Sequence, residues 1–559
     1  MTEATTTSRL VDELASRFWE GYLEREPIYA TLLGDERYDD RLPDPGPAGR
    51  AAQEAAYRDV LRTAQGIERD GLALEDEITL DMLTVVAHIG LAQLEHRLHE
   101  LLAVDQLAGA QALPGDLARL QRADSPERFE RLLARLAAYP AFLSACQDNM
   151  ADAVASGLTA ARSVVERTIE QTRRFVEAPA DESPLMRALP LSEADRERLR
   201  EALERHVRPA QARYLEALER YLPHARPADG LWSVPDGEAI YRTLVLASTT
   251  LEADPRELHE YGLAQIESIG EEREAVARKL GHADAAALRR ALDADPANHA
   301  TEPAAIVALA EAQIERAMAE APRWFGRQPR ATCQVRAVEP YQEQEAPPAF
   351  YYPPAMDGSR GGIYYVNTYQ PADRPLHQLA ARTFHEAIPG HHFQIAIESE
   401  LEGLPPFRRL GSRLVGVAYP EGWGLYVERL ADEMGLYETD HERLGMLDAQ
   451  AWRAARLVID TGIHAFGWDR QRSIELLVSI GLSPLEAETE TDRYIAWPAQ
   501  ALSYMVGQRE LNALRAEAAQ RHGPAFDLRA FHDSVLGHGA LPLATLRREL
   551  PAWLERGGA

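Results

Sequence analysis

The sequence predicts a mainly α-helical protein with one small inserted β-sheet. Apolar residues recur at helical spacing along most of the 559 residues. The pattern changes only between about 331 and 367, where short runs are rich in β-branched and aromatic residues. No repeat of fixed length occurs, so a solenoid is not expected. We divide the chain into a helical N-terminal region, 1–325, and a region with the sheet and further helices, 326–559, which together would form one continuous body.

The N-terminal region opens with a predicted helix from Ser8 to about Leu33, in which Leu10, Leu14 and Phe18 recur near helical spacing. A loop rich in Pro, Gly and Asp closes this element. Further helices are expected at about 49–70, 74–103, 126–179 (a pair whose second member spans 149–177), 192–221 and 254–280.

Three runs predict the strands of the small sheet, at 333–338, 349–352 and 362–367, with a Gly-rich turn before the last. The sheet directly precedes a helix that carries a histidine-rich motif. An exposed strand edge at this place could bind an extended peptide through backbone hydrogen bonds. The alternative is a structural hairpin that covers the core.

The next helix, predicted from about 375 to 400, carries the motif Phe384–Gln394. His385 followed directly by Glu386 is typical of zinc hydrolase helices, in which the His binds the ion and the Glu acts as general base. The second His of that pattern is expected four residues further on, but Pro389 stands there. Two histidines follow slightly later instead.

Helix geometry bears on which later histidine, His391 or His392, can share a metal ion with His385. On an unbroken helix His391 would point about 120° away from His385. His392 would lie about 10 Å further along the axis, too far for two bonds of about 2 Å. A bulge is expected at Pro389 and Gly390, because proline has no N–H and glycine tolerates unusual backbone angles. A two-residue bulge would bring in His391, which we prefer, and a three-residue bulge would bring in His392; the alternative is a helix break with histidines that cap or pack nearby.

A later segment, 419–429, places two carboxylates on one helix face. Glu421 and Glu428 lie seven residues apart, about two turns. Their neighbours Trp423 and Tyr426 indicate a mostly buried helix, where unpaired carboxylates are costly and a cation would relieve the cost. We assign Glu421 as the third metal ligand and Glu428 as a partner that orients a ligand histidine.

The remaining helices are expected at about 439–466, 470–480, 484–494, 496–518 and 541–556. A zinc peptidase needs a hydrogen-bond donor for the oxyanion of its tetrahedral intermediate, and a tyrosine hydroxyl is suitable. Tyr504 is the first candidate and Tyr494 the second. Asn367, Arg493 and Tyr494 are candidate substrate-binding residues.

Composition and charge limit the partners. The formal net charge of −28 disfavours nucleic acids and anionic membrane surfaces. Cys146 and Cys333 are the only cysteines, so neither a disulfide framework nor a thiolate zinc site is expected. No apolar run reaches about 18 residues, and the first residues lack the basic-then-apolar pattern of a signal peptide. We expect a cytoplasmic protein without a membrane anchor.

These motifs resemble a bacterial family known as domain of unknown function 885. The resemblance rests on the runs 385–392, 421–428 and 500–504, and it extends over most of the chain, from Pro27 to the pattern at 541–543. The family is regarded as mainly helical and related to the gluzincin metallopeptidases, with largely unassigned substrates.

The second of these runs is also similar to a motif of the aminopeptidase-N and leukotriene-hydrolase group. There an Asn-Glu-Gly segment supplies the third zinc ligand, and a further Glu follows seven residues later. This resemblance implies the same roles for Glu421 and Glu428. The spacing after His385 departs from that group, so the resemblance does not choose between His391 and His392.

We predict a zinc-dependent hydrolase of peptide or related amide bonds in small substrates. His385, His391 and Glu421 would hold Zn²⁺ and leave a fourth position for water. Glu386 would act as general base, assisted by Tyr504. A dipeptidase, an aminopeptidase and a carboxypeptidase all fit this prediction.

Two other functions are compatible with the same residues. The same metal site could hydrolyse a non-peptide bond, such as an epoxide, a lactone or a modified amide. The chain could also be a helical binding or scaffold protein in which the histidine cluster is structural.

Arg360, Arg382 and Arg493 are candidates for binding a substrate carboxylate, although ion pairing is the commoner role of arginine. The sequence does not indicate an oligomeric state.

Overall fold

The computed structural model describes residues 3–339, 343, 346–355, 358 and 360–555. It is mainly α-helical with a three-stranded sheet, which confirms the predicted fold class. The chain forms two compact units. The first contains Met1–Thr243, Ile463–Arg470 and Thr489–Pro498, and the second contains Leu244–Gly462, Gln471–Glu488 and Ala499–Ala559. The division of the sequence into 1–325 and 326–559 stays a prediction.

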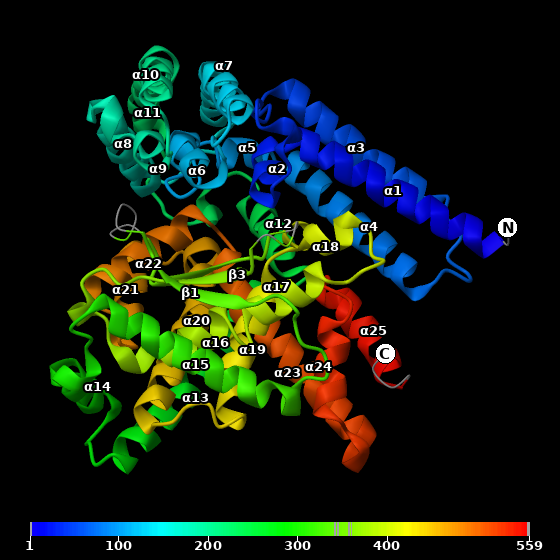
Figure 1. Ribbon diagram of the computed structural model, residues 1–559, viewed down its shortest axis with the longest axis vertical. Helices are drawn as coiled ribbons and strands as arrows, with labels where there is room; N and C mark the ends of the chain where they lie inside the picture. Colours follow the sequence, from blue (N-terminus) through cyan, green and yellow to red (C-terminus); the bar gives the residue numbers. More distant parts are fainter. Residues whose placement is uncertain (1–2, 340–342, 344–345, 356–357, 359, 556–559) are drawn as a thin grey trace. The chain divides into compact units, whose positions relative to one another are not determined.

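The first unit is built of helices. They are α1 (Glu3–Arg25), α2 (Pro27–Leu33), α3 (Pro47–Gln65), α4 (Leu74–Glu95), α5 (Leu98–Leu101), α6 (Leu113–Leu120), α7 (Pro126–Ser156), α8 (Arg162–Glu177), α9 (Pro184–Ala188), α10 (Glu193–Ala202), α11 (Arg208–Tyr221), the first half of α12 (Gly237–Thr249), the end of α20 (Asp440–Phe466) and most of α22 (Pro484–Ala496). Figure 1 shows α1, α3 and α4 packed side by side.

Three helices predicted for this unit are interrupted in the structure. The predicted helix at 8–33 ends before Pro27, which starts α2 because proline lacks an N–H and suits the first helical position. The predicted helix at 74–103 breaks at Arg97, whose φ is 52°. The predicted start of the second helix in the 126–179 pair is wrong, because Gly157, with a φ of 80°, ends α7.

Within the described residues, α4 is the one helix long and apolar enough to cross a membrane by length and composition. An 18-residue window of α4 has a mean hydropathy of 1.3. Half of that window is buried inside the protein, and core helices of globular proteins share these properties. The helix is therefore weak evidence for a membrane span.

The second unit holds the sheet and the histidine motif. Its elements are the second half of α12, α13 (Pro255–Lys279), α14 (Ala285–Ala294), α15 (Pro303–Trp324), β1 (Cys333–Ala337), β2 (Ala349–Tyr352), β3 (Gly362–Val366), α16 (Leu379–Glu386), α17 (His391–Ser399), α18 (Pro406–Leu410), α19 (Ala418–Glu433), most of α20 (Asp440–Phe466) and of α21 (Arg470–Ser479), the start of α22 (Pro484–Ala496), α23 (Ser503–His522), α24 (Leu528–Leu536) and α25 (Leu543–Glu555).

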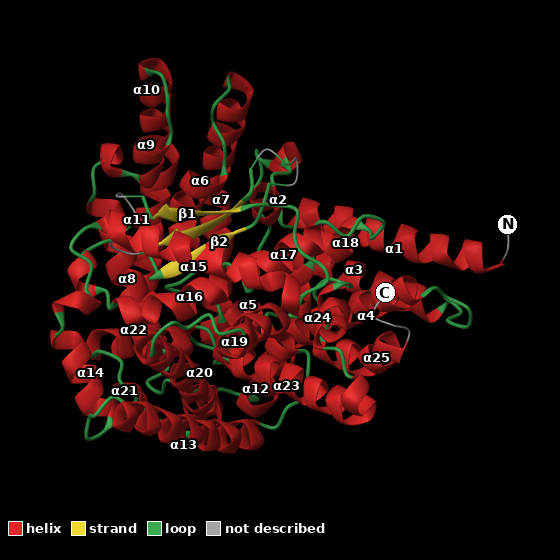
Figure 2. Cartoon of the chain, turned by 60° about the horizontal axis from the view of Figure 1, so that its bottom comes forward, coloured by secondary structure: helices red, strands yellow, loops and turns green. Residues whose placement is uncertain are grey.

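The sheet has the strand order β1-β3-β2, in which β1 is parallel and β2 antiparallel to the central β3. Cys333 pairs with Gly362, and Ala349 pairs with Val366. The three predicted strands are all present. Helices α15 and α16 contact the sheet, as Figure 2 shows.

Hydrogen bonds connect α16 to β3 of the sheet and to α15. The hydroxyl groups of Tyr364 on β3 and Thr383 on α16 lie 3.4 Å apart. The Thr383 hydroxyl also donates to Oε1 of Gln313 on α15, at 2.8 Å. All three residues are buried. The sheet and α15 therefore hold the helix that carries His385 in a fixed place.

Helices α19 and α23 cross at a pair of glycines. A Cβ at Gly507 would lie 1.9 Å from the carbonyl oxygen of Ala418, and a Cβ at Gly422 would lie 2.4 Å from Cα of Gly507. Only glycine permits this approach of the two backbones. The close crossing lets Nε2 of Gln508 on α23 donate to the carbonyl of Leu425 on α19, at 2.9 Å.

Replacing Gly507 with Ala is expected to lower the free energy of unfolding by about 1–3 kcal/mol or more, because α19 and α23 must move apart. Gly270→Ala is the matched control. Gly270 also lies inside a helix, α13, but an added Cβ there meets nothing within 4 Å. This control should raise stability by up to about 1 kcal/mol. Urea unfolding followed by circular dichroism measures both, and two variants of equal stability would contradict the close crossing.

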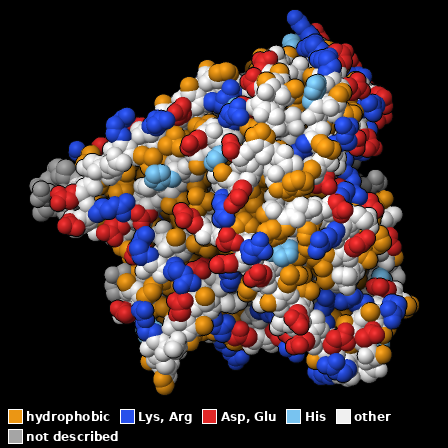
Figure 3. Space-filling view, turned by 180° about the vertical axis from the view of Figure 1, so that it is seen from behind, with side chains coloured by type: hydrophobic (Ala, Val, Ile, Leu, Met, Phe, Trp, Pro, Cys, Tyr) orange, Lys and Arg blue, Asp and Glu red, His pale blue; other side chains and the backbone are white. Residues whose placement is uncertain are grey.

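Charged side chains of both signs are interspersed on the surface that Figure 3 draws. No large area of one sign is visible on that face. The net charge of −28 is therefore not concentrated in one patch of this face, and the expectation that the protein binds no nucleic acid stays a prediction.

Candidate metal centre

The histidine motif forms two helices instead of one bulged helix from about 375 to 400, so that prediction is wrong. Helix α16 ends at Glu386, and α17 begins at His391. The connection is tied to α19, because Nε1 of Trp423 donates to the carbonyl of Pro389 at 2.9 Å. Proline interrupts helical hydrogen bonding, and here a complete break replaces the expected bulge. The break places the rings of His385 and His391 4.8 Å apart, centre to centre, at 84°.

His385, His391 and Glu421 form a group that could hold a metal ion. Nε2 of His385 and Nε2 of His391 each lie 3.5 Å from the same oxygen of Glu421, Oε2. One ligand atom from each residue lies within 4.8 Å of the other two. Ligand atoms around a tetrahedral zinc ion, at bonds of about 2.1 Å, are about 3.4 Å apart. The two distances to Glu421 are therefore long for hydrogen bonds and close to those between ligands of one ion.

The other ring nitrogen of His385 is held by Glu428. Nδ1 of His385 lies 2.8 Å from Oε1 of Glu428, whose second oxygen accepts from Nε2 of Gln450 at 2.9 Å. Nε2 of Gln508 donates in turn to Oε1 of Gln450, at 2.8 Å. A proton on Nδ1 leaves the lone pair of Nε2 directed at Glu421. Metal-binding histidines are oriented by carboxylates in the same way.

The ring of His385 also packs closely against α19. A Cβ at Gly424 would lie 2.7 Å from Cε1 of His385, so a side chain there would displace the ring. His385 is only 3% exposed. Gly424 and Glu428 therefore fix both the position and the rotation of the imidazole.

The electrostatics of the group favour a positive charge. Burial lowers the pKa of His385, but the nearby carboxylates of Glu421 and Glu428 outweigh it and raise the pKa to about 10. Burial raises the pKa of Glu421, but His385 and His391 outweigh it and hold that pKa well below its usual value. The buried Glu428 and the partly buried Glu421 thus stabilise a cation at this point, and a divalent ion bound by neutral imidazoles can supply that charge.

His392 lies outside the group. Its Nδ1 is 2.8 Å from the hydroxyl of Tyr351, and its Nε2 is 3.1 Å from the carbonyl of Ala331. The carbonyl requires the proton on Nε2, so Nδ1 accepts from the tyrosine and neither nitrogen is free for a metal ion. Burial lowers the pKa of His392 to about 4, which keeps the ring neutral. His392, the alternative ligand, thus connects α17 to Tyr351 on β2 instead of binding the metal ion.

Glu386 and Tyr504, the predicted general base and oxyanion donor, both lie close to His385. Glu386 is half-buried and makes no hydrogen bond or ion pair with any residue that the structure describes. Its charge is among those that raise the pKa of His385. The Tyr504 ring is 7% exposed and lies 6.4 Å from the His385 ring at an interplanar angle of 27°. Their roles in catalysis stay predictions.

The predicted substrate-binding residues belong to different units. Asn367 lies in the second unit, and its side-chain amide is bonded to three backbone groups. Arg493 and Tyr494 lie in the first unit, where the Tyr494 hydroxyl donates to Glu490 at 2.7 Å and Arg493 is 3.8 Å from the same carboxylate. Substrate binding by these three residues stays a prediction.

Three residues that support the site were not predicted from the sequence: Gly424, Gln450 and Gln508. Both glutamines are buried, Gln450 to 1% exposure and Gln508 to 4%. A buried side-chain amide requires hydrogen-bond partners, and this is the signal that could have found them. Nothing in the sequence pattern shows which imidazole Gly424 would accommodate.

Fold and site together define a helical protein with a largely buried His-His-Glu group that could hold a metal ion. The chain belongs to the family of bacterial proteins of unknown function called DUF885, whose profile matches residues 27–550. This finding confirms the resemblance to that family. No curated protein matches the chain.

Two solved structures have a similar fold. A presumed lipoprotein from Colwellia psychrerythraea has a TM-score of 0.90 and 24% sequence identity, covering 98% of this chain and 100% of its own. A presumed lipoprotein of unknown function from Shewanella oneidensis has a TM-score of 0.76 and 19% identity, covering 97% of this chain and 99% of its own. At these identities the similarity establishes the fold alone.

Proposed function

We propose that the protein is a zinc-dependent hydrolase of peptide or related amide bonds in small substrates. The observation that carries the proposal is the pair of 3.5 Å distances from His385 and His391 to one oxygen of Glu421. Two nitrogen ligands and one carboxylate leave a fourth position open, as catalytic zinc sites do. A zinc ion held there would polarise the scissile carbonyl and lower the pKa of a water molecule.

The chain's own residues supply the proton transfers. Glu386 takes a proton from the attacking water as the water oxygen bonds to the carbonyl carbon. The same carboxyl group then gives this proton to the amine nitrogen as the C–N bond breaks. The Tyr504 hydroxyl has no hydrogen-bond partner among the described residues and is available to donate to the oxyanion.

The resemblance to gluzincin metallopeptidases supports the same assignment. Glu421 and Glu428 have the spacing of the ligand and the following Glu in the aminopeptidase-N group, and here they flank the two nitrogens of His385. The location stays a prediction: the sequence favours the cytoplasm, whereas both similar structures are named as presumed lipoproteins.

Removal of the metal should abolish turnover. The zinc-loaded protein is incubated with a panel of short peptides, amides, esters, lactones and epoxides, and the products are identified by mass spectrometry. We expect cleavage of peptide or amide bonds, loss of that activity after dialysis against a chelator, and recovery when zinc is restored. Turnover of esters or epoxides alone would contradict the proposed cleavage of peptide or amide bonds. Activity that persists after dialysis against the chelator would contradict the proposed requirement for a metal ion.

A further inference from the structure

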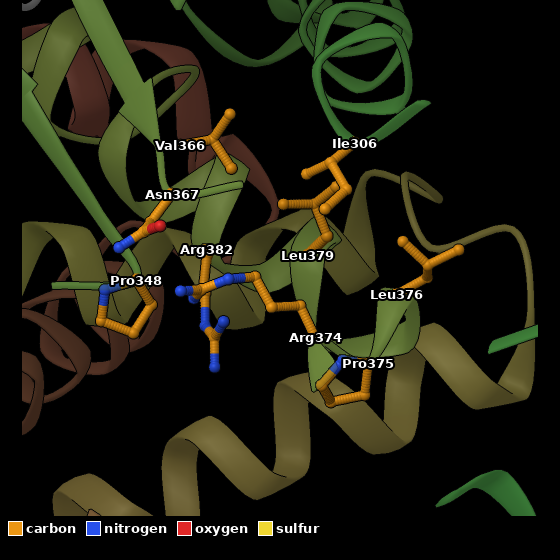
Figure 4. A pocket seen from close by; sticks show the side chains of 9 residues that line it. All are labelled: Ile306, Pro348, Val366, Asn367, Arg374, Pro375, Leu376, Leu379 and Arg382. Atoms are coloured by element: carbon orange, nitrogen blue, oxygen red, sulfur yellow. The ribbon is translucent and has the colours of Figure 1, made fainter. Parts of the chain in front are cut away.

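Two arginines project into one hollow of the second unit. Arg374 and Arg382 line it together with Asn367 and with apolar side chains from α15, β3 and α16. Figure 4 shows the two guanidinium groups reaching into the same space. Each guanidinium is charged and carries several N–H donors, so the hollow presents groups that attract an anion.

No residue in the described part of the chain forms an ion pair with either arginine. Nε of Arg374 donates to the carbonyl of Tyr369 at 2.7 Å, and Nη2 of Arg382 donates to Oε1 of Gln378 at 2.8 Å. Both of these partners are neutral. The remaining N–H donors of two charged groups are therefore left for a ligand.

The acidic residue that acts on both arginines is Glu486, which is exposed and caps its own helix; Asp373 and Glu343 have smaller effects on Arg374. Its carboxylate accepts the backbone N–H of Ser483 at 3.1 Å and the Ser483 hydroxyl at 2.8 Å. Burial lowers the pKa of Arg374 and of Arg382, because a charged group in a poorly solvated place is costly. A bound anion would remove that cost.

A third arginine, Arg453 on α20, acts electrostatically on Arg382 and also lies beside the Tyr504 ring. Its charge, like that of Arg374, adds to the effect of burial in lowering the pKa of Arg382. Its guanidinium is 5.8 Å from the centre of the Tyr504 ring, which faces His385. Nε of Arg453 is buried and has no hydrogen-bond partner among the described residues. Positive charge is therefore present beside Tyr504 as well as in the hollow.

The distance from this charge to the metal group corresponds to a short piece of peptide. Arg382 lies one turn before His385 and Glu386 on α16, so these side chains occupy neighbouring positions on the helix. One turn is about 5.4 Å, and long helical side chains lean further toward the N-terminus. One peptide residue spans about 3.8 Å between Cα atoms. An anion at the arginines would lie about one or two residues from a carbonyl at the metal group.

We propose that Arg374, Arg382 and Arg453 bind the C-terminal carboxylate of a short peptide, so that the protein releases one or two residues from that end. This inference rests on the proposed function and names its substrate class. The positive cluster would repel the ammonium group of a substrate, which disfavours an aminopeptidase. A guanidinium pair matches the two oxygens of a carboxylate.

The test measures binding to zinc-loaded Glu386→Gln protein by isothermal titration calorimetry. The probes are acetyl-Ala-Ala-Phe, its C-terminal amide and acetyl-Ala-Asp-amide, which carries a carboxylate only on its side chain. We expect the free acid to bind about 10–100-fold more tightly than either amide, the range for hydrogen bonds to a charged group. Arg382→Gln should reduce this preference to within a few-fold, and Arg453→Gln serves the same purpose if the first variant does not fold.

Arg360→Gln is the matched control. Arg360 also lies in the second unit, but it donates to the carbonyls of Gly361 and Pro353 and does not line the hollow. The preference for the free acid should persist in this variant. Equal binding of acid and amide would overturn the inference, as would equal binding of the Asp-amide, while peptide cleavage by the wild-type protein would still support the proposed function. If the wild-type protein cleaves no peptide, the proposed function itself fails.

Discussion

Replacing Glu386 with Gln is expected to lower kcat for peptide hydrolysis by about 10²–10⁴-fold, the usual contribution of a general base. Glutamine has nearly the same shape as glutamate but cannot take a proton from water. Glu386 is half-buried, has no hydrogen bond or ion pair within the described chain, and follows the ligand His385 directly. The fold and the zinc content should therefore not change.

Initial rates, zinc content and the unfolding temperature of the same sample are compared between variant and wild type. Glu402→Gln is a suitable control, because Glu402 is exposed and pairs with the exposed Arg330 at 3.0 Å. This control should keep wild-type kcat. Full activity in the Glu386 variant would eliminate the mechanism, and loss of zinc along with activity would indicate that Glu386 is a ligand.

Glu421→Ala is expected to weaken zinc binding much more than Glu428→Gln. Glu421 contributes the oxygen that both histidines share, whereas Glu428 contacts Nδ1 of His385 and Gln450, and no other member of the metal group. Loss of an outer partner of a ligand histidine typically costs about 10–100-fold in metal affinity. We expect that range for Glu428→Gln and a larger loss for Glu421→Ala.

A competition titration with a chromophoric chelator measures the zinc affinity of both variants. Circular dichroism shows whether each variant keeps its helices. If Glu421→Ala binds zinc as tightly as the wild type, the carboxylate is not a ligand. If the order of the two effects is reversed, Glu428 has the role that we give to Glu421.

The pattern of the sequence predicts the fold class and most of the helices, because their periodicity is a local property. It also selects His385, His391 and Glu421, which the structure brings together. His385 and Glu421 come from different helices, and two carboxylates in a helix predicted to be mostly buried are what indicate that they meet. The free-energy cost of unpaired carboxylates in a buried helix, more than their spacing, indicates that Glu421 meets His385.

The shape of the connection after Glu386 could not be predicted in the same way. Local rules allow a bulge or a break at Pro389, and the choice depends on Trp423, which binds the free carbonyl from another helix. The choice between His391 and His392 likewise depends on Tyr351 and on the backbone at residue 331. Such contacts arise only when the elements are packed.

The arginines near the site illustrate the same limit. Arg360 and Arg382 are equivalent candidates in the sequence, but the first binds backbone carbonyls and the second faces the hollow. Arg374 and Arg453 carry no local signal at all. Their common feature is that neither forms an ion pair within the described chain, which is a property of the packed structure.

The central claim is that His385, His391 and Glu421 bind one zinc ion. X-ray diffraction from zinc-loaded crystals, measured on both sides of the zinc absorption edge, tests it most directly. We predict one anomalous peak about 2.0–2.2 Å from Nε2 of each histidine and from an oxygen of Glu421. A zinc-loaded crystal with no peak at this group, or with its only peak elsewhere, would contradict the claim.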